Sequence, residues 1–537
     1  MVSAANAHAT EAGLEILRAG GTAADAAIAV QLALNLVEPQ SSGIGGGAFF
    51  VHWDAAGRNL KTYDGRETAP AAARPERFLA GGEPMAFGAA VHSGLSIGTP
   101  GLVRLLETVH RRHGRLPWAR LFDPAIRLAD NGFQVSERLH AQLRERGAAA
   151  FDPAARRYFF AADGTPWPAG HLLANPEFAV TLRAIAAQGA DAFYTGPIAA
   201  AIVAAAREAP NHAGDLTLAD LAGYRAIERP PLCFVYRRHR ICGMGPPSSG
   251  ALAVAQTLLL VEPFDLGRGR DAVLNARALH FIAEAEKLAY ADRNFYIADP
   301  DFVPVPSGLI DAGYLAERRR SIDPARAMRP PQAGSPPGKS GSLPGRDGTR
   351  ESAGTSHISI VDGHGNAVAM TTTIEDTFGS RVWAAGFLLN NELTDFSFEP
   401  QDRSGRVIVN RVEAGKRPRS SMAPTIVFDE AGQVAAVLGS PGGGRIILYV
   451  AKALIALIDW QLDVQAAAAL PNFGSFGGPL EVEHRAAAAF TVAPHLLALG
   501  HTLVPTPMAS GLHIVVVREG RLEGGADPRR EGLAKGD

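Results

Sequence analysis

Residues 354–373, GTSHISIVDGHGNAVAMTTT, constrain the fold of this chain more than any other segment. Alternating apolar and polar residues on both sides of a Gly-rich turn predict two paired β-strands. The pattern begins abruptly at Thr355, directly after residues 329–354, which are rich in Pro, Gly and Ser and are predicted to form a flexible linker. A well-patterned hairpin therefore starts at a single threonine.

Helical and strand patterns occur on both sides of the linker. Before it, helical patterns dominate, at residues 9–19, 23–37, 100–150, 196–207 and 276–292, with strand patterns at 47–53 and 60–65. After it, strand patterns dominate, at residues 356–362, 367–373, 424–429, 434–440 and 512–519. This mixture predicts a single α+β body interrupted by a surface loop, rather than two separate domains.

Composition excludes some classes of partner. The chain has 537 residues and a net charge of −2, so nothing in its charge indicates binding to nucleic acid or to an anionic membrane. The longest apolar stretch, residues 26–37, is too short to cross a bilayer. No signal-peptide pattern follows Met1. We therefore expect a cytoplasmic protein on this sequence, or a periplasmic or secreted one if a leader has been removed.

Cys233 and Cys242 are the two cysteines of the chain, and they flank a predicted strand pair. They have neither the spacing of a metal site nor the number expected of a disulfide framework. Because a free cysteine packs as a small apolar residue, both are predicted to be ordinary core residues.

Two glycine-rich stretches have different contexts. Residues 43–48, GIGGGA, follow a predicted helix and precede a strand, the reverse of a dinucleotide-binding fingerprint, so they predict a tight turn. Residues 438–446, LGSPGGGRI, follow a strand and end at a predicted helix start. In one interpretation, the backbone N–H groups of this stretch bind an anion or an oxyanion. In the other, the stretch is only a structural turn.

Thr355 combines a hydroxyl with the first position of a strand. A threonine inside a chain is a poor nucleophile, but an N-terminal threonine carries its own base in its free α-amine. Cutting the bond between Gly354 and Thr355 would create both groups together, and a glycine before the cut leaves its carbonyl accessible. The alternative is a hairpin that merely follows a loop, with threonine chosen for its β-propensity.

Eight segments of the sequence resemble the gamma-glutamyltransferase family, in the order seen there. They span nearly the whole chain and include residues 355–373, FGS at 378–380, FLLNNELTDFS at 387–397, KRPRSSMAPTIV at 416–427, GSPGGGRI at 439–446, residues 11–50, DGRETAP at 64–70 and GGADPRREG at 524–532. The resemblance implies the N-terminal nucleophile hydrolase fold, a four-layer αββα sandwich with two stacked, mainly antiparallel sheets. It also implies self-cleavage into a large subunit, 1–354, and a small subunit, 355–537, that form one body.

The resemblance also assigns roles at the reacting centre. It implies that Thr355 is the nucleophile and, through its amine, the base, and that Thr373 orients it. Gly442 and Gly443 match the glycines whose N–H groups form the family's oxyanion hole. The cleavage site lies between Gly354 and Thr355.

The same resemblance implies residues that bind the acyl donor. Arg66 matches the arginine that grips the α-carboxylate, since its planar fork meets two oxygens at once. Ser420 and Ser421 match serines that add hydrogen bonds to that carboxylate. Glu392 and Asp395 match the acidic pair that holds the α-ammonium.

Two features depart from well-studied members of the family. Glu375 stands where many of them have asparagine, and a further carboxylate there either strengthens ammonium binding or serves a different donor. Glu375 lies two residues past Thr373, so on a continuing strand both side chains share a face. Residues 396–419 vary in the family and form an active-site lid in some members; this sequence does not decide whether a lid exists.

We therefore expect an enzyme that cleaves a γ-glutamyl amide through a threonine acyl-enzyme and passes the acyl group to water or to an amino acid or peptide. No metal or organic cofactor is predicted. One alternative is a glutaryl or cephalosporin acylase of the same fold. The other is an unprocessed, non-catalytic protein that binds amino-acid-like ligands.

Overall fold

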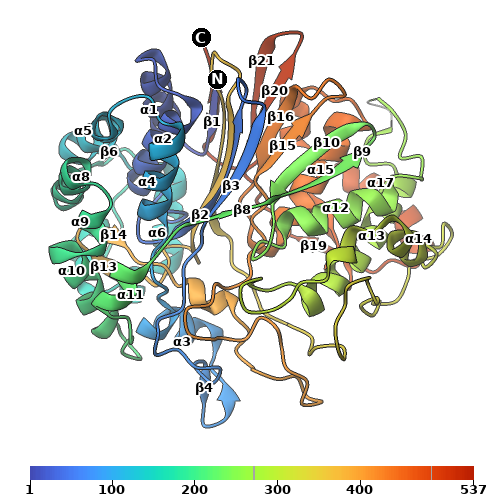
Figure 1. The fold of residues 1–537 in the computed structure, drawn as a ribbon, viewed down its shortest axis with the longest axis horizontal. Helices are drawn as coiled ribbons and strands as arrows, with labels where there is room; N and C mark the ends of the chain where they lie inside the picture. The colour runs from blue at the N-terminus through green and yellow to red at the C-terminus, as the bar shows by residue number, and fades with distance from the viewer. Residues whose placement is uncertain (270–271, 485–486) are drawn as a thin grey trace.

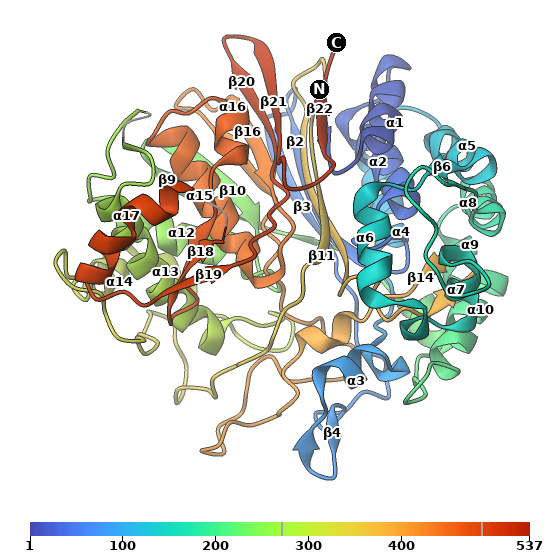
Figure 2. The same ribbon diagram turned by 180° about the vertical axis from the view of Figure 1, so that it is seen from behind.

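Two large β-sheets lie face to face at the centre of the molecule, and helices cover the outer side of each (Figure 1, Figure 2). The computed structural model describes residues 1–269, 272–484 and 487–537. The layers follow the order helix, sheet, sheet, helix. This arrangement confirms the predicted αββα sandwich.

The first sheet has seven strands, in the order β22-β1-β11-β12-β2-β3-β8, and each neighbouring pair is antiparallel. Its strands are β1 (Val2–Ala4), β2 (Gly47–Asp54), β3 (Asn59–Gly65), β8 (Ile227–Arg229), β11 (Gly354–Val361), β12 (Ala367–Glu375) and β22 (Leu533–Lys535). The predicted hairpin is therefore the β11–β12 pair at the centre of this sheet.

The second sheet has six strands, in the order β21-β20-β16-β15-β10-β9, and it is also antiparallel throughout. Its strands are β9 (Pro231–Tyr236), β10 (His239–Met244), β15 (Thr425–Phe428), β16 (Val434–Gly439), β20 (His513–Arg518) and β21 (Arg521–Ala526). Strands from before and after Gly354 are mixed in both sheets, so residues 1–354 and 355–537 share one core.

Helices of the first outer layer pack on the seven-stranded sheet (Figure 1). The longer ones are α1 (Ala7–Arg18), α2 (Ala23–Val37), α4 (Leu102–His113), α5 (Asp123–Asn131), α6 (Glu137–Arg146), α8 (Pro176–Gln188) and α10 (Gly196–Arg207). Shorter ones are α3 (Phe87–Val91), α7 (Pro153–Phe159), α9 (Asp191–Tyr194) and α11 (Leu218–Gly223). Every residue of α2 is buried, which its small alanine side chains permit, and Thr22 and Asp25 form the capping box at its start.

Helices of the second outer layer cover the six-stranded sheet (Figure 1). They are α12 (Gly250–Val261), α13 (Ala276–Tyr296), α14 (Ala312–Arg319), α15 (Ile446–Ile458), α16 (Val464–Ala469) and α17 (Ala487–Ala498). Small sheets flank the body: β4 (Leu79–Ala80) with β5 (Glu83–Pro84), β6 (Phe133–Gln134) with β7 (Leu172–Leu173), β13 (Trp383–Ala384) with β14 (Phe387–Leu388), and β17 (Phe473–Gly474), β18 (Leu480–Glu483) and β19 (Leu503–Thr506). None of the described helices has the length and apolar character needed to cross a membrane.

The space between the two sheets is filled by apolar side chains from both. Val51 and Val361 of the first sheet pack with Ile426, Val437 and Val515 of the second, and all five are buried. These residues alternate along their strands with residues that face the helices, as the strand patterns require. This packing fixes the position of β11 relative to the second sheet.

The prediction that Cys233 and Cys242 are ordinary core residues is wrong, because they form a disulfide bond. They occupy β9 and β10, where the register of the hairpin places them directly opposite one another with their Cα atoms 4.1 Å apart. The two cysteines lie at equal distances from the turn between the strands, and this spacing could have predicted that they face each other. The number of cysteines, on which the prediction relied, contains no information about strand register.

The predicted linker, residues 329–354, forms no helix, and it forms no strand before Gly354. Its last part nevertheless packs against the body. Gly345 pairs with Ile408, the N–H of Asp347 donates to the carbonyl oxygen of Asn294 over 2.8 Å, and the side chain of Glu351 is buried. The chain is therefore held in place as it approaches Thr355.

Candidate active site

Thr355 lies at the start of β11, opposite Thr373 of β12, and only 3% of it is exposed. The register of the two strands shifts between Gly354 and Thr355, so regular pairing begins at the predicted nucleophile. The hydroxyl of Thr355 lies 3.5 Å from that of Thr373. The two threonines that the family resemblance assigns to the reacting centre therefore lie beside each other.

The shortest hydrogen bond of the Thr373 hydroxyl is to Gly354, the residue before the predicted cleavage site. This hydroxyl donates to the carbonyl oxygen of Gly354 over 2.6 Å and accepts the N–H of Glu375 over 2.8 Å. A donor on that oxygen polarises the carbonyl carbon that Thr355 would attack, and it is in place to stabilise negative charge on the oxygen. Thr373 is thus positioned to act on the carbonyl of the cleaved bond as well as on the nucleophile.

Two positions near the predicted cleavage site, Gly354 and Gly443, require glycine because a side chain would clash with nearby backbone. A Cβ atom on Gly354 would clash with the carbonyl oxygens of Glu375 and Asp376, and one on Gly443 would clash with the carbonyl oxygen of Ser352. Gly442 and Gly443 lie between β16 and α15, the predicted strand-to-helix context, and both have positive φ. The glycine turn therefore packs directly against the linker, next to Thr355.

A single pocket brings the predicted site residues together. Its lining comes from both parts of the chain and consists of Arg66, Glu351, Ser352, Thr355, Thr373, Glu375, Glu392, Asp395, Ser420, Ser421, Met422, Gly443 and Ile446. Of the residues predicted to act on substrate, Gly442 is outside this lining, one position before Gly443. The pocket has a free volume of only about 20 Å³, and Glu351 and Ser352 of the linker form part of its wall.

Arg66 follows β3 and is buried, with its guanidinium group directed at two carboxylates. It donates to Glu392 and, over 2.5 Å, to Asp395, and it also donates to the carbonyl oxygens of Pro418 and Arg419. Burial alone would lower the pKa of Arg66, but Glu392 and Asp395 raise it above its ordinary value. The predicted carboxylate-binding arginine and the predicted acidic pair are therefore paired with each other in this uncleaved chain.

The pocket is rich in buried carboxyl groups. Burial raises the pKa of Asp395 to about 7 and raises the pKa values of Glu375 and Glu392 well above their ordinary value, and neighbouring carboxylates add to each shift. Like charges held this close favour either protonation or a bound cation. Each of these carboxyl groups is therefore stabilised by a bound proton or by a neighbouring cation, as Arg66 stabilises Glu392 and Asp395.

Glu375 lines the pocket together with Thr355 and Thr373, although the strand on which its predicted orientation depended does not continue past it. Its carboxylate accepts the N–H of Ser352 over 2.8 Å and the side-chain N–H of Asn391 over 2.5 Å. Its φ of 79° shows that the chain turns here instead of continuing as a regular strand. Glu375 therefore contacts the linker and belongs to the same acidic group as Glu392 and Asp395.

Ser420 and Ser421 lie at the same pocket but make different contacts. The Ser420 hydroxyl accepts the N–H of Met422 over 3.1 Å, whereas the Ser421 hydroxyl donates to Glu351 over 2.5 Å and accepts from Arg293 over 2.6 Å. Ser421 is therefore already bonded to a carboxylate, one supplied by the linker.

Sequence reasoning missed four charged residues of this region: Glu67, Arg293, Glu351 and Arg419. Glu67 is fully buried next to Arg66; neither of its carboxylate oxygens has a hydrogen-bond partner among the described residues, and burial raises its pKa to about 8. Glu67 and Arg419 adjoin predicted site residues in the sequence, and that adjacency was an available signal. Arg293 lies in the last turn of α13, far away in sequence, so only the fold reveals it.

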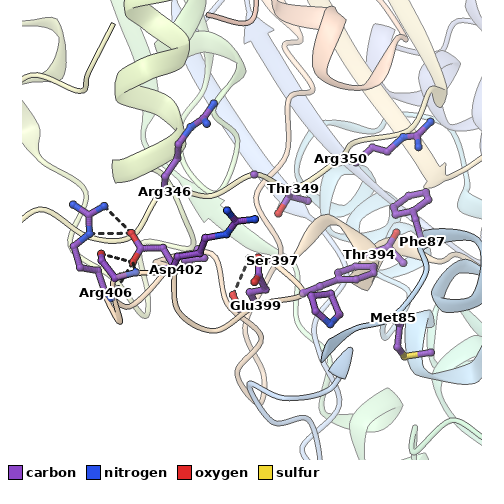
Figure 3. Close-up of a pocket in the computed structure, with 16 residues that line it drawn as sticks. Met85, Phe87, Arg346, Thr349, Arg350, Thr394, Ser397, Glu399, Asp402 and Arg406 are labelled. Atoms are coloured by element: carbon purple, nitrogen blue, oxygen red, sulfur yellow. Dashed lines mark hydrogen bonds and ion pairs between the residues drawn. The ribbon is translucent and has the colours of Figure 1, made fainter. Parts of the chain in front are cut away.

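A second, larger cavity of about 560 Å³ adjoins this site (Figure 3). Its wall combines the linker, at Arg346, Thr349 and Arg350, with the loop that follows Asp395. Thr394 lines this cavity, and its hydroxyl lies 3.4 Å from the carboxylate of Glu375. The variable loop, residues 396–419, thus forms part of a wall beside the pocket, and its role as a lid stays undecided.

The described residues also include one group with the geometry to hold a metal ion, away from Thr355. Ligand atoms of His280, Glu284 and His501 lie within 4.8 Å of one another. The Nζ atom of Lys287 donates to Glu284 over 2.7 Å, and the two histidines are hydrogen-bonded over 2.8 Å. An ammonium group therefore already neutralises the carboxylate, and the absence of a metal cofactor stays a prediction.

Comparison with known proteins agrees with this geometry. The family model of gamma-glutamyltranspeptidase matches residues 9–536. The glutathione hydrolase proenzyme of Escherichia coli is 37% identical over 98% of this chain and 90% of its own length. The acylase ACY 1 proenzyme of Pseudomonas sp. (strain SE83) is 34% identical over 98% of this chain and 91% of its own.

Solved structures of related proteins also superpose on this chain. The cephalosporin acylase from Bacillus halodurans superposes with a TM-score of 0.85 at 27% identity, covering 100% of this chain and 96% of that one. The gamma-glutamyltranspeptidase of Helicobacter pylori superposes with a TM-score of 0.57 at 34% identity, covering 60% of this chain and 91% of that one. Because the family model matches nearly the whole chain and a relative is 37% identical over 98% of it, this protein belongs to the gamma-glutamyltranspeptidase family.

Proposed function

We propose that this chain is a proenzyme that cleaves itself between Gly354 and Thr355 and then transfers γ-glutamyl groups from amides such as glutathione to water or to amino compounds. The observation that carries the proposal is the placement of Thr355. Its hydroxyl lies beside that of Thr373, which is bonded to the Gly354 carbonyl. The pocket around them is lined by Arg66 and four carboxylates, one of which belongs to the linker. The curated relatives named as glutathione hydrolase proenzymes support the proposal.

The first step would be an acyl shift within the chain. The Thr355 oxygen attacks the Gly354 carbonyl carbon, the C–N bond breaks, and the proton passes to the new α-amine of Thr355. Thr373 stabilises the oxyanion formed at Gly354. Water then hydrolyses the resulting ester, which leaves Thr355 as a free N-terminal residue that carries its own base.

Turnover repeats this chemistry on the donor amide. The Thr355 oxygen attacks the γ-carbonyl carbon while its amine accepts the hydroxyl proton, and the backbone N–H groups of Gly442 and Gly443 stabilise the oxyanion. The leaving amine takes the proton, and a γ-glutamyl ester of Thr355 remains. Water or an incoming amine attacks that ester and releases the product.

The acidic lining favours a γ-glutamyl donor over a glutaryl donor. A γ-glutamyl group carries an α-ammonium, which Glu375, Glu392 and Asp395 can stabilise while lowering their own pKa values. A glutaryl group lacks that cation. The glutaryl or cephalosporin acylase remains the second candidate, because the Bacillus halodurans enzyme superposes over the whole of this chain.

A paired assay separates these two functions. The kcat/KM values for γ-glutamyl and glutaryl anilides are measured on the processed enzyme, and we expect the γ-glutamyl donor to be preferred. Glu375→Gln should reduce that preference about tenfold or more, because a charged hydrogen bond contributes about 1.5–3 kcal/mol. The control is Glu430→Gln, which changes an exposed glutamate outside the pocket.

A preference for the glutaryl donor that Glu375→Gln increases further would assign this chain to the acylases. An unchanged ratio would place Glu375 outside the donor site. A protein that stays uncleaved and hydrolyses neither donor would support the remaining alternative, a binding protein.

A further inference from the structure

The turn that follows β12, residues 375–381, packs against the residue before the predicted cleavage site. A Cβ atom on Gly354 would lie 2.5 Å from the carbonyl oxygen of Glu375 and 2.5 Å from that of Asp376. The carboxylate of Glu375 also accepts the N–H of Ser352, two residues before Gly354, over 2.8 Å. The turn therefore contacts the linker at two points close to the cleavage site.

The backbone of this turn has an unfavourable conformation. Glu375, Phe378 and Arg381 have φ values of 79°, 70° and 63°, although all three carry side chains. Residues other than glycine seldom adopt positive φ, and such a conformation persists only where the surrounding contacts hold it. The 375–381 turn therefore requires contacts that fix its shape.

Two arginines provide such contacts through Asp376. The carboxylate of Asp376 accepts a hydrogen bond from Arg381 over 2.6 Å at one oxygen and from Arg146 over 3.3 Å at the other. Asp376 and Arg381 are only 8% and 3% exposed, and charge-assisted hydrogen bonds are strong when they are buried. Because Arg146 is the last residue of α6, Asp376 connects the two ends of the turn to each other and to that helix.

Arg381 is itself held from outside the turn. Its guanidinium group donates to Nδ1 of His92 over 2.8 Å, and its carbonyl oxygen accepts the N–H of Asp152 over 3.2 Å. Burial lowers the pKa of Arg381 to about 10, so it stays charged at neutral pH and needs a counter-charge. Asp376 supplies that counter-charge.

The carboxylate of Asp376 is separate from the pocket beside Thr355. Asp376 is not among the residues that line this pocket. The pocket carboxylate of Glu375 has its own anchor, the side-chain amide of Asn391, which donates to it over 2.5 Å. The same amide accepts the backbone N–H of Asp376 over 2.9 Å, a bond that a change of the Asp376 side chain leaves in place. Loss of the Asp376 charge should therefore loosen the turn more than the pocket.

We propose that Asp376 is a positioning residue for self-cleavage. Its ion pair with Arg381 fixes the 375–381 turn against Gly354, and thereby holds the Gly354 carbonyl group beside the hydroxyl of Thr373. This role rests on the proposed function, because it concerns the same cleavage. The contact between the turn and the linker does not depend on cleavage and is tested separately.

The first experiment compares self-cleavage with turnover. Asp376→Asn keeps the shape of the side chain and removes its charge. Its cleavage is followed on denaturing gels after cell-free synthesis, and kcat/KM for a γ-glutamyl anilide is then measured on the fully cleaved enzyme. We expect cleavage to slow about tenfold or more, the effect of losing one charged hydrogen bond, and kcat/KM to change by less than about threefold, because Gly354 no longer lies beside Thr355.

The matched control is Asp130→Asn, which removes the same charge from an exposed ion pair with Arg183. This variant should cleave at the unaltered rate. Cleavage of Asp376→Asn at the unaltered rate would overturn the proposal. An equal loss of cleavage and of turnover would also overturn it, since it would show that Asp376 only supports the fold of the pocket.

Variants of the two arginines test whether the ion pair is the cause. Arg381→Gln should slow cleavage as much as Asp376→Asn, and the double variant should be no slower than either, because both changes remove one interaction. Arg381→Lys keeps the charge and should restore part of the rate. Fully additive effects in the double variant would show that Asp376 does not act through Arg381, and would overturn the proposal.

A milder variant covers the case in which Asp376→Asn does not fold, as circular dichroism would show. The side chain of Arg146 is 33% exposed, so Arg146→Gln leaves no buried charge at its own position. It should slow cleavage about threefold, since a partly exposed ion pair contributes less than a buried one. An unaltered rate for a folded Arg146→Gln chain would then count against the proposal.

The second experiment measures the position of the linker without cleavage. In the uncleaved Thr355→Ala chain, hydrogen exchange detected by mass spectrometry reports on residues 350–354, which include the N–H of Ser352. We expect Asp376→Asn to accelerate exchange of this segment about tenfold or more, because opening of the turn becomes easier. Asp130→Asn should leave the exchange unchanged.

Equal exchange in the chains with and without Asp376→Asn would overturn the proposal. If the unaltered chain does not cleave itself, the proposed function fails, while the exchange experiment still decides whether Asp376 fixes the linker.

Discussion

The hydroxyl of Thr373 is hydrogen-bonded to the carbonyl oxygen of Gly354, at the bond that we propose is cut. Thr373→Ala removes a donor from the position where an oxyanion develops, and loss of such a donor slows a reaction by about 100- to 1000-fold. We expect self-cleavage of Thr373→Ala to slow to that degree, as measured by denaturing gel over time. Thr373→Ser keeps the hydroxyl and should restore the rate; equal rates for Ala and Ser would contradict this role.

Glu67 provides a prediction about pH. Burial raises the pKa of Glu67 to about 8, above the ordinary value for glutamate near 4. Between these two pKa values the folded chain binds more protons than the unfolded chain. Protonated Glu67 therefore contributes to the free energy of unfolding at low pH, and this contribution is lost as the pH rises through 8. Glu67→Gln should therefore make Tm fall less steeply between pH 5 and pH 8.

The measurement is Tm by differential scanning calorimetry at each pH, on the uncleaved Thr355→Ala background so that processing does not interfere. Glu430→Gln, at an exposed position, is the control and should keep the original slope. A Glu67→Gln chain with that same slope would show that Glu67 does not titrate with folding.

At the scale of elements, β9 and β10 form a hairpin closed by the disulfide between Cys233 and Cys242. A cross-link over so short a loop contributes about 2–3 kcal/mol by the loop-entropy estimate. For a chain of this length that corresponds to a decrease in Tm of about 2 °C. We expect Cys233→Ser/Cys242→Ser to show that decrease, and a thiol reagent to find no free cysteine in the unaltered, unreduced protein.

Titration of two free thiols in the denatured, unreduced protein would contradict the disulfide.

At the scale of the whole molecule, cleavage after Gly354 should not separate the two parts. Dividing the 56.4 kDa chain in proportion to length gives fragments of roughly 37 and 19 kDa on a denaturing gel. Because strands of both fragments are mixed in both sheets, they should co-elute on native size exclusion. The smaller fragment should begin with Thr-Ser-His-Ile, and Thr355→Ala should remain full-length. A single intact band from active protein would contradict self-cleavage.

The sequence by itself determined the β11–β12 hairpin, the helices around it and the order of the motifs, because these depend on local periodicity and on residues adjacent in the chain. The family resemblance, and not the hairpin pattern, singled out Thr373, which the structure places opposite Thr355. The helix-before-strand order around residues 43–48 was likewise readable, and it correctly predicted a turn.

Only the tertiary structure decided which distant residues meet. The pairing of Cys233 with Cys242 depends on strand register. The pairing of Arg66 with Glu392 and Asp395 depends on how β3 approaches the loop after β14. The ion pair of Glu351 with Arg293 depends on where the last turn of α13 lies relative to the linker. Local sequence contains no information about such long-range contacts, because they arise when separate elements bury their apolar faces against a shared core. The physics of packing, and not any motif, therefore places a carboxylate of the linker inside the pocket beside Thr355.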